Sequence, residues 1–371
     1  MLAKVPNFDF SPEGRARIRN TLTPPSYVAY LVFMMLILAL IVQYLFALAD
    51  GHGPHGDDEV EAGPVSIAPV EFTVSGHISQ FVQEWPGKTG LSEYPSSFTR
   101  GVEPKPIHSH NDYWQKVPFY QGLSVGAVST EADVWARDGD LLVGHEQTAL
   151  DPKRTFRSLY VDPIVEVLEK QNPTTQFSNN TRCGPFDESC FQTLYLWVDL
   201  KTGVKETWPL VAAQLAPLRE RNWLTKWDGK IIIPGPVTVI GTGSSNWEVL
   251  IANKTRERDY FVDAPLLKIG AESEQMHADG KTPLYDSSSS PFATTSLIAA
   301  VGPIKGELSE KQLKKVEKLV KIAKERGILT RFWETPNWST RRRHNIWRQL
   351  ADIPVGLLNV DDLEDAAYGD W

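Results

Sequence analysis

The chain has 371 residues, of which 42% are apolar and 23% charged, a composition typical of folded globular proteins and not of disordered ones. Its formal net charge of -8 argues against a nucleic-acid partner, because binding to a phosphate backbone requires a basic surface. A chain of this length can bury a core without help from a metal or a disulfide, and an α/β barrel of about 250 residues fits within it.

An uncharged apolar run over residues 26–49 is the first feature in chain order. At about 1.5 Å per residue, a helix of this length spans the hydrocarbon core of a bilayer. Four Lys or Arg residues precede the run and the first one after it is Lys88, so the positive-inside tendency leaves residues 1–25 in the cytosol. We expect a single-pass signal-anchor helix, with the catalytic domain in the secretory or vacuolar lumen or outside the cell.

Ala47-Leu48-Ala49, at the end of this run, has the small-x-small form of a signal-peptide cleavage site. A cleaved signal peptide is therefore the alternative, and it gives the same topology. Residues 50–71 are rich in Gly, Pro, Asp and Glu, which predicts a flexible tether. Residues 72–371 are expected to form the folded domain, beginning with an N-terminal extension that has no clear strand or helix.

From Pro106 onward, apolar runs typical of β-strands alternate with helical patterns, which predicts βα units and a parallel sheet. The eight candidate strands are the residues leading into His108, then 128–134, 194–200, 237–240, 260–262, 296–301, 327–332 and 355–359. The clearest helical patterns are 162–171, 205–221, 309–326 and 340–350. The segment 272–291 breaks the alternation, so one helix is expected to be missing there.

Eight strands interleaved with helices predict an α/β fold of the (β/α)8 TIM-barrel type, with a doubly wound open sheet as the alternative. Active sites of such barrels lie at the C-terminal ends of the strands. The candidate functional residues of this chain obey that rule, because they close or follow the first three predicted strands.

Three acidic residues close the second and third predicted strands: Glu131, Asp133 and Asp199. Side chains two residues apart on a strand project from the same face, which pairs Glu131 with Asp133 and Asp199 with Lys201. Carboxylate oxygens are hard ligands that suit Mg²⁺ or Ca²⁺. The pattern therefore predicts a divalent metal site, with Lys201 available to bind a phosphate oxygen.

Two histidines flank these carboxylates in sequence. His110 follows the first strand, and His145 follows a turn and a short predicted strand that folds back toward the acidic residues. Imidazoles with a pKa near about 6.5 can share the roles of general base and general acid around neutral pH. His108 has the same strand parity as His110, and we expect it to play a supporting or structural role.

Cys183 and Cys190 are the only cysteines of the chain. In an oxidising compartment, two cysteines this close predict a local disulfide, whereas a metal pair or two free thiols is the alternative. The sequons at Asn179, Asn253 and Asn337 would be N-glycosylated in the same compartment.

The motifs His108-Ser-His-Asn-Asp112, Glu131-Ala-Asp133, Val143-Gly-His145 and Asp199-Leu-Lys201 together resemble the phospholipase C-like phosphodiesterase barrels. These include the glycerophosphodiester phosphodiesterases and the sphingomyelinase D type of spider venom. A closer resemblance is to the fungal family of altered inheritance of mitochondria protein 6. It is based on the longer motifs His108-Ser-His-Asn-Asp-Tyr-Trp114, Glu131-Ala-Asp-Val-Trp135 and Asp199-Leu-Lys-Thr202, on Val143-Gly-His145, and on the stretch Arg154-Thr-Phe-Arg-Ser-Leu-Tyr160. The resemblance implies a metal-dependent phosphoric diester hydrolase, in which His110 and His145 act as acid and base.

One motif departs from these enzymes. Glycerophosphodiester phosphodiesterases carry His-Arg-Gly where this chain has His110-Asn111-Asp112, so Asn111 stands in the place of an arginine that grips phosphate. We assign Asn111 to substrate binding with Lys201, and the expected substrate is a phospholipid or a lipid-derived head group. The alternative function is a catalytically inactive, membrane-tethered barrel that binds a lipid or a protein partner.

Overall fold

The computed structural model describes residues 99–177, 181–243 and 247–369, all of which belong to one compact unit. The expected anchor over 26–49, the tether over 50–71, most of the N-terminal extension and the sequon at Asn179 lie outside the described residues. Within the described ranges, no helix combines the length and the apolar character that a membrane crossing requires.

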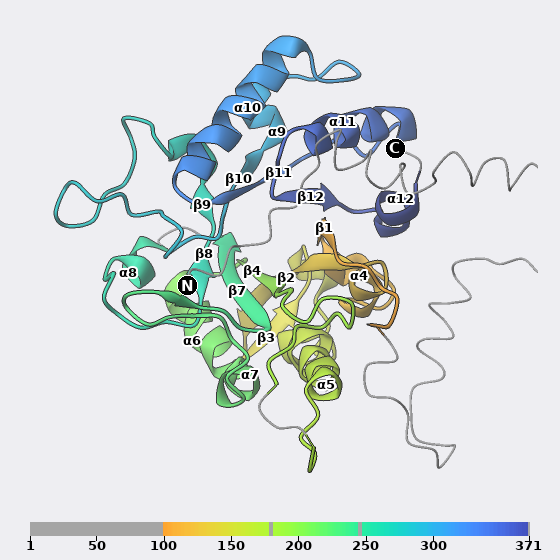
Figure 1. Ribbon diagram of the computed structural model, residues 1–371, viewed down its shortest axis with the longest axis vertical. Coiled ribbons are helices and arrows are strands. Elements are labelled where there is room, and N and C mark those ends of the chain that lie inside the picture. Colours follow the sequence, from red (N-terminus) through yellow and green to blue (C-terminus); the bar gives the residue numbers. More distant parts are fainter. Residues whose placement is uncertain (1–98, 178–180, 244–246, 370–371) are drawn as a thin grey trace, which may run out of the picture. The chain divides into compact units, whose positions relative to one another are not determined.

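A parallel sheet forms the centre of this unit (Figure 1). Its strands follow the spatial order β8-β7-β4-β2-β1-β12-β11-β10-β9, and the antiparallel hairpin strand β3 pairs with β2. The strands are β1 (Lys105–Ser109), β2 (Ala127–Arg137), β3 (Asp140–Val143), β4 (Leu194–Leu200), β7 (Val237–Gly243), β8 (Phe261–Val262), β9 (Ala264–Pro265), β10 (Phe292–Ser296), β11 (Leu329–Trp333) and β12 (Leu357–Val360). A separate two-stranded sheet pairs β5 (Lys226–Trp227) with β6 (Ile232–Ile233).

The first and last strands of this order are neighbours in the chain, because only Asp263 separates β8 from β9. β8 pairs with β7 through two residues, and β9 pairs with β10 through two residues. Residues 261–265 thus act as one interrupted strand that nearly closes the sheet. The expected α/β barrel is confirmed as a parallel, nearly closed, TIM-barrel-like sheet, which the doubly wound alternative does not predict.

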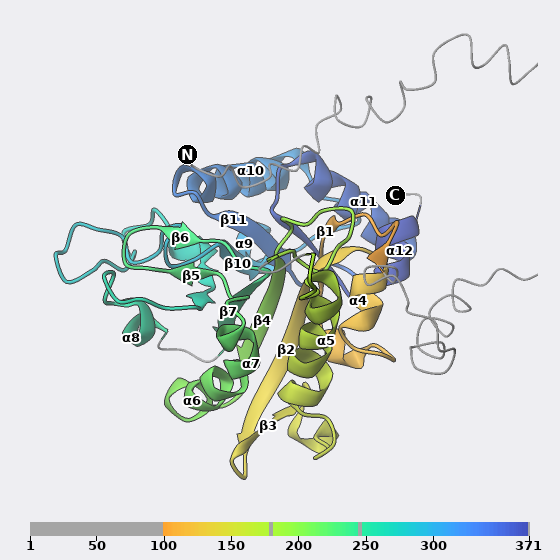
Figure 2. The same ribbon diagram turned by 60° about the horizontal axis from the view of Figure 1, so that its bottom comes forward.

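Helices follow the strands on the outside of the sheet, as Figure 2 shows for α5, α6 and α7. The helices are α4 (Tyr120–Ser124), α5 (Asp162–Gln171), α6 (Val204–Gln214), α7 (Ala216–Glu220), α8 (Glu248–Ile251), α9 (Leu297–Val301), α10 (Glu310–Glu325), α11 (Thr340–Asp352) and α12 (Leu363–Tyr368). Short 3-10 segments cover Asp112–Trp114, Gln147–Ala149 and Leu266–Lys268, and a π-helical turn covers Arg157–Val161.

Helix α10 illustrates how the sequence places these helices. It buries Val316, Val320 and Ala323, which recur at intervals of four and three residues and therefore share one face. At its start, the side-chain oxygen of Gln312 accepts a hydrogen bond from the backbone N–H of Ser309 at 3.0 Å, as in a capping box. The apolar stripe packs against the sheet, and the charged positions face solvent.

Two predicted elements were wrong in detail. The strand expected over 296–301 is instead β10 at Phe292–Ser296 followed by helix α9, because Ser296 caps the helix by accepting a hydrogen bond from the N–H of Ala299 at 3.1 Å. The single helix expected over 205–221 is divided into α6 and α7, with a proline in the first turn of α7. The helix expected to be missing over 272–291 is indeed absent from that segment, all of which is described.

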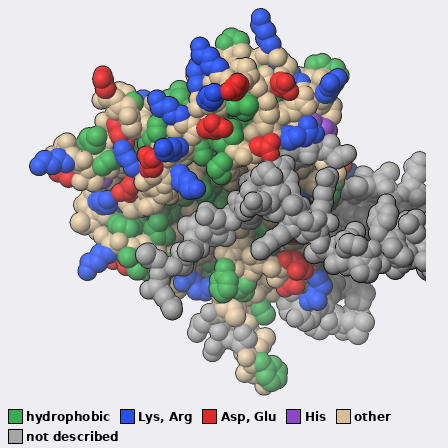
Figure 3. Space-filling view, turned by 45° about the horizontal axis from the view of Figure 1, so that its top comes forward, with side chains coloured by type: hydrophobic (Ala, Val, Ile, Leu, Met, Phe, Trp, Pro, Cys, Tyr) green, Lys and Arg blue, Asp and Glu red, His purple; other side chains and the backbone are tan. Residues whose placement is uncertain are grey.

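The predicted disulfide between Cys183 and Cys190 is confirmed, with 4.3 Å between the two Cα atoms. The loop that it closes precedes β4. On the outer surface, the face in Figure 3 shows Lys and Arg side chains interspersed with Asp and Glu. Charges of both signs thus alternate over that face.

Gly126 allows β1 and β2 to approach each other. Its φ is +88°, and a Cβ added there would lie 2.1 Å from the carbonyl oxygen of Glu103. Gly139 has a similar φ of +82° in the hairpin between β2 and β3, with open space around it.

We expect Gly126→Ala to lower the free energy of unfolding by about 3 kcal/mol or more, because it adds a clash to the cost of the backbone conformation. Gly139→Ala, the matched control, should cost only about 1 to 2 kcal/mol. Urea denaturation measures both, and equal losses would contradict the clash.

Candidate active site

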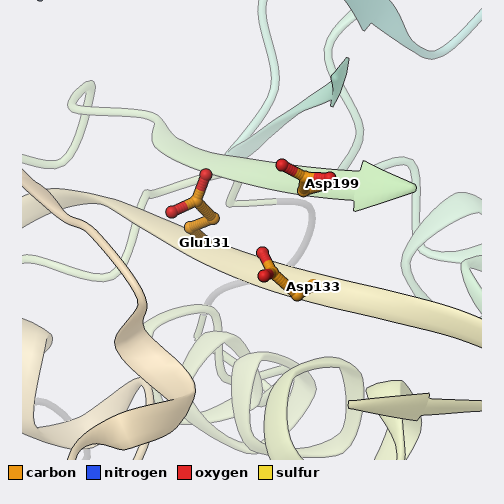
Figure 4. A group of neighbouring side chains, drawn as sticks. All are labelled: Glu131, Asp133 and Asp199. Carbon is orange, nitrogen blue, oxygen red and sulfur yellow. The ribbon is translucent and has the colours of Figure 1, made fainter. Parts of the chain in front are cut away.

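The three predicted acidic residues lie together on β2 and β4. Asp199 is next to last in β4, as predicted, whereas β2 continues to Arg137, so Glu131 and Asp133 lie within this strand and do not close it. Parallel pairing sets Asp133 opposite Asp199, and Glu131 projects from the same face of β2 as Asp133 (Figure 4). One oxygen from each carboxylate lies within 4.8 Å of the other two. This group, which we call the carboxylate cup, can hold a metal ion, and its all-oxygen donor set suits Mg²⁺ or Ca²⁺.

The electrostatics of the carboxylate cup favour a bound cation. Burial and the charge of Asp133 raise the pKa of Asp199 to about 7. Burial and the charge of Glu131 likewise raise the pKa of Asp133, although Lys201 opposes the shift. Carboxylates that repel one another in a partly desolvated space gain stability when a divalent cation enters. The residues therefore fit a divalent metal.

Lys201 bridges two members of the carboxylate cup. Its ammonium lies 2.9 Å from Asp133 Oδ2 and 3.3 Å from Asp199 Oδ1. Burial lowers the pKa of Lys201, but the charges of Asp199 and Asp133 outweigh burial and raise it above the ordinary value. The lysine is therefore a fixed cation at the mouth of the barrel.

His145 is held through its Nδ1 atom. This nitrogen lies 3.1 Å from Asp133 Oδ2 and 3.0 Å from the hydroxyl of Tyr113. Tyr113 donates to Asp133 Oδ2 at 2.6 Å, and burial with the negative charge of Asp133 raises the pKa of the phenol far above its usual range. The imidazole is half-exposed, and its Nε2 lies 3.9 Å from Oε1 of the exposed Glu146, which is too far for a hydrogen bond. A ligand in the pocket can therefore reach Nε2.

His110 is held in the same manner by a residue that the sequence reasoning missed. Its Nδ1 donates to Asp361 Oδ1 at 2.7 Å, and its Nε2 lies 3.9 Å from Glu131. Burial lowers the pKa of His110, but the hydrogen bond to Asp361 and the charge of Glu131 outweigh burial and raise it. Asp361 follows β12, next to β1 in the barrel but 251 residues away in the chain.

Asn111 lies beneath these groups and is buried, with a left-handed φ of 49°. Its backbone N–H donates to Glu131 Oε2 at 3.1 Å, and its side-chain oxygen lies 2.5 Å from the hydroxyl of Tyr113. These contacts tie Asn111 to the carboxylate cup. The predicted role of Asn111 in substrate binding stays a prediction.

His108 is fully buried, and its Nδ1 lies 2.7 Å from Ser129 Oγ. Burial and the charge of Arg331 lower its pKa to about 3, so the imidazole is neutral at physiological pH. A neutral, enclosed imidazole fits the supporting role that we expected for it.

A pocket of about 510 Å³ opens over the carboxylate cup, within the range typical of ligand sites. Its lining includes all seven residues that the sequence assigned to catalysis, metal or substrate binding: His110, Asn111, Glu131, Asp133, His145, Asp199 and Lys201. A larger groove of about 1310 Å³ lies toward the N-terminal ends of β4 and β7, and none of those seven residues lines it. The candidate functional residues therefore all belong to the smaller pocket.

The stretch Arg154 to Tyr160 supports the site from outside the barrel. Arg154 donates to the backbone carbonyl of Tyr113 at 2.5 Å, and Tyr160 donates to the carbonyl of Glu131 at 2.9 Å. Its motif thus braces both the loop after β1 and strand β2. Sequence reasoning missed Tyr113, although it lies inside a quoted motif, because nothing in the pattern distinguishes it from a core aromatic.

Comparison with known proteins decides the family. A family model described as an AIM6-like phosphodiesterase domain matches residues 96–263. A relative from Arthroderma benhamiae, named altered inheritance of mitochondria protein 6 homolog, is 43% identical over 75% of this chain and 88% of its own length. The chain belongs to the altered inheritance of mitochondria protein 6 family.

Two further members of the altered inheritance of mitochondria protein 6 family come from Candida glabrata and Eremothecium gossypii. They are 33% and 31% identical, over 73% and 70% of this chain and over 72% and 67% of their own lengths. No solved structure matches the chain significantly. The resemblance read from the motifs is thereby confirmed for this family.

Two sequons of this family member lie on described, exposed segments. Asn253 precedes β8, and its side-chain oxygen accepts from the hydroxyl of Thr255 at 2.9 Å. Asn337 follows β11, and its side-chain nitrogen donates to Asp361 Oδ2 at 2.5 Å. Their glycosylation stays a prediction.

We expect Mg²⁺ or Ca²⁺ to stabilise the protein through the carboxylate cup. At about 100 times the dissociation constant, a bound ion raises the free energy of unfolding by about 2.7 kcal/mol. Thermal unfolding with and without each ion measures this gain. Asp199→Asn should abolish it, whereas Glu166→Gln, which removes a carboxylate on outer helix α5, should leave it intact. An equal gain in both variants would place the ion elsewhere.

Asp361→Asn should lower the pKa of His110, because it removes the hydrogen bond and the charge that offset burial. NMR titration of the imidazole in metal-free protein measures the shift. Asp362→Asn is the matched control, because it removes the charge of the next residue in the chain. The Asp362 side chain accepts hydrogen bonds from the Asp365 N–H and from Arg343 and not from His110, so this variant should leave the pKa of His110 unchanged. A pKa that is insensitive to Asp361→Asn would rule out this pairing.

Proposed function

We propose that the protein is a metal-dependent phosphoric diester hydrolase that uses His110 and His145 as acid and base. The proposal rests on the fact that both imidazoles are held in the same way, by a carboxylate at Nδ1. Each has its Nδ1 on an aspartate, Asp361 for one and Asp133 for the other. An Nδ1–H bond to a carboxylate leaves Nε2 available for proton transfer.

The carboxylate cup lies between these imidazoles and would hold the metal through Glu131, Asp133 and Asp199. A divalent ion bound there would neutralise charge on phosphoryl oxygens. Lys201 contributes a second positive charge at the same place. One histidine takes a proton from the attacking hydroxyl, and the other protonates the departing alkoxide. The attacking group is either water or a hydroxyl of the substrate itself, which would form a cyclic phosphate first.

The proposed substrate is a phospholipid or a lipid-derived head group. Exposed indoles of Trp114 and Trp333 flank the pocket: Trp114 packs against His145 with 5.5 Å between ring centroids, and Trp333 lines the pocket. Indole rings suit the boundary between water and lipid.

We further propose a single-pass membrane anchor over residues 26–49 and a catalytic domain in the secretory or vacuolar lumen or outside the cell. The Cys183–Cys190 disulfide supports this location, because such bonds persist in oxidising compartments.

Turnover of a panel of phosphodiesters by the full chain, with and without Mg²⁺ or Ca²⁺, tests the proposed function. His110→Ala and His145→Ala should each lower kcat/KM by about 10² to 10⁴-fold, since general acid and base catalysis contributes that much. His344→Ala removes an imidazole that lies on α11 beside Asp365, and should leave the rate unchanged.

Two outcomes would contradict the proposal. Turnover that survives both His110→Ala and His145→Ala would exclude the assigned acid and base. A folded wild-type protein that binds metal but hydrolyses no diester would instead support the catalytically inactive barrel.

A further inference from the structure

Arg331 on β11 enters the barrel from the side opposite the carboxylate cup. Its side chain is 3% exposed, yet it lines the pocket. The guanidinium lies 4.4 Å from the centre of the Trp197 ring on β4, and Nη1 donates to Asn359 Oδ1 at 2.9 Å. Stacking and one hydrogen bond thus hold the guanidinium in a fixed place.

The positive charge of Arg331 has no direct counter-ion among the described residues. No described carboxylate lies within 4.0 Å of the guanidinium, and its buried Nε has no acceptor there. Burying an arginine is costly, because its charge is removed from water, and among the described residues only the more distant charges of Glu131 and Asp263 offset that of Arg331. An anion bound in the pocket would remove that cost.

The nearest candidate counter-ions are already engaged. Glu131 accepts from the backbone N–H of Asn111 and lies 3.7 Å from His108 Nε2. Asp263 Oδ2 accepts from the hydroxyls of Thr242 at 3.1 Å and Thr294 at 2.5 Å. Neither carboxylate pairs directly with the guanidinium, although the buried Oδ1 of Asp263 has no hydrogen-bond partner among the described residues. The Nε of Arg331 likewise has no acceptor there, so it can donate to a ligand.

We propose that Arg331 binds the phosphoryl oxygens of the ligand, across the pocket from Lys201 and the carboxylate cup. The pocket thereby has a guanidinium, although Asn111 stands where related phosphodiesterases carry an arginine. Guanidinium donors form a planar fork that matches two oxygens of a phosphate. Arg331 is a binding residue of the proposed reaction, and its ligand is the phosphate group shared by lipid and water-soluble phosphodiesters.

The positions of two cations support this assignment. Lys201 and Arg331 both line the pocket, so a phosphate bound between them would meet a positive charge on each side. That the ligand is a diester rests on the proposed function, whereas the affinity of Arg331 for a phosphate oxygen does not.

Calorimetric titration of the full chain with inorganic phosphate, in detergent and with and without Mg²⁺, tests the proposal. Arg331→Met should weaken phosphate binding about 10-fold or more, because a charge-assisted hydrogen bond contributes about 1.5 to 3 kcal/mol. Arg331→Lys keeps the charge but loses the fork, so it should weaken binding less. Both losses should persist without Mg²⁺.

Arg258 provides a matched control. It is also a buried arginine over a tryptophan, 5.7 Å from the centre of the Trp227 ring, but it does not line the pocket. Arg258→Lys should leave phosphate binding unchanged. If Arg331→Met does not fold, NMR of the wild-type protein provides the test. The ¹⁵Nε signal of Arg331 is identified by its loss in Arg331→Lys, and we expect this signal to shift when phosphate is added.

Unchanged phosphate affinity in a folded Arg331→Met variant would overturn the proposal, as would an Nε signal that phosphate does not move. Arg331-dependent phosphate binding without hydrolysis of any diester would retain this inference and reject the proposed function. Hydrolysis of a diester, together with phosphate binding that does not depend on Arg331, would support the proposed function and reject this inference.

Discussion

The pairing of β2 with β4 is the constraint on which the site depends. Their parallel register sets Asp133 beside Asp199, and the alternation of side chains along β2 then adds Glu131 to the same face. A shift of either strand by one residue would turn its acidic side chains away from the pocket. The ladder between β4 and β7 continues this register over seven residue pairs. The geometry of the carboxylate cup is therefore a property of the sheet and not of flexible loops.

The loops carry the two imidazoles that we propose as acid and base, and they are held by buried polar contacts. Tyr113 connects the loop after β1 to Asp133 and His145, while Asp361 joins the end of β12 to His110. Each contact places a loop residue against a strand that is already fixed. The imidazoles consequently share the rigidity of the barrel, which the proposed acid and base catalysis would require.

Much of the carboxylate cup was predictable from the sequence, because it depends on short-range alternation within a strand. The bounds 194–200 predicted for β4 match the structure, and the paired spacing of Asp199 and Lys201 came with them. The strand expected at 296–301 failed because an apolar run of five residues suits a helix as well as a strand, and only the cap at Ser296 decides between them. Asp361 and Arg331 could not be found, because their partners are brought near only by closure of the barrel.

The interrupted strand at 261–265, which closes the sheet, is held to its neighbours by few backbone hydrogen bonds. The sheet is joined there by two residue pairs on each side of Asp263, whereas β2 and β4 share six pairs and β4 and β7 share seven. The carboxylate cup stands on the strongly paired part, and Arg331 stands beyond β1, on the part that ends at β9. Local opening begins where few backbone bonds must break. A phosphate held between Lys201 and Arg331 would therefore connect the two sides of a weakly paired joint, so that an occupied barrel resists opening more than an empty one.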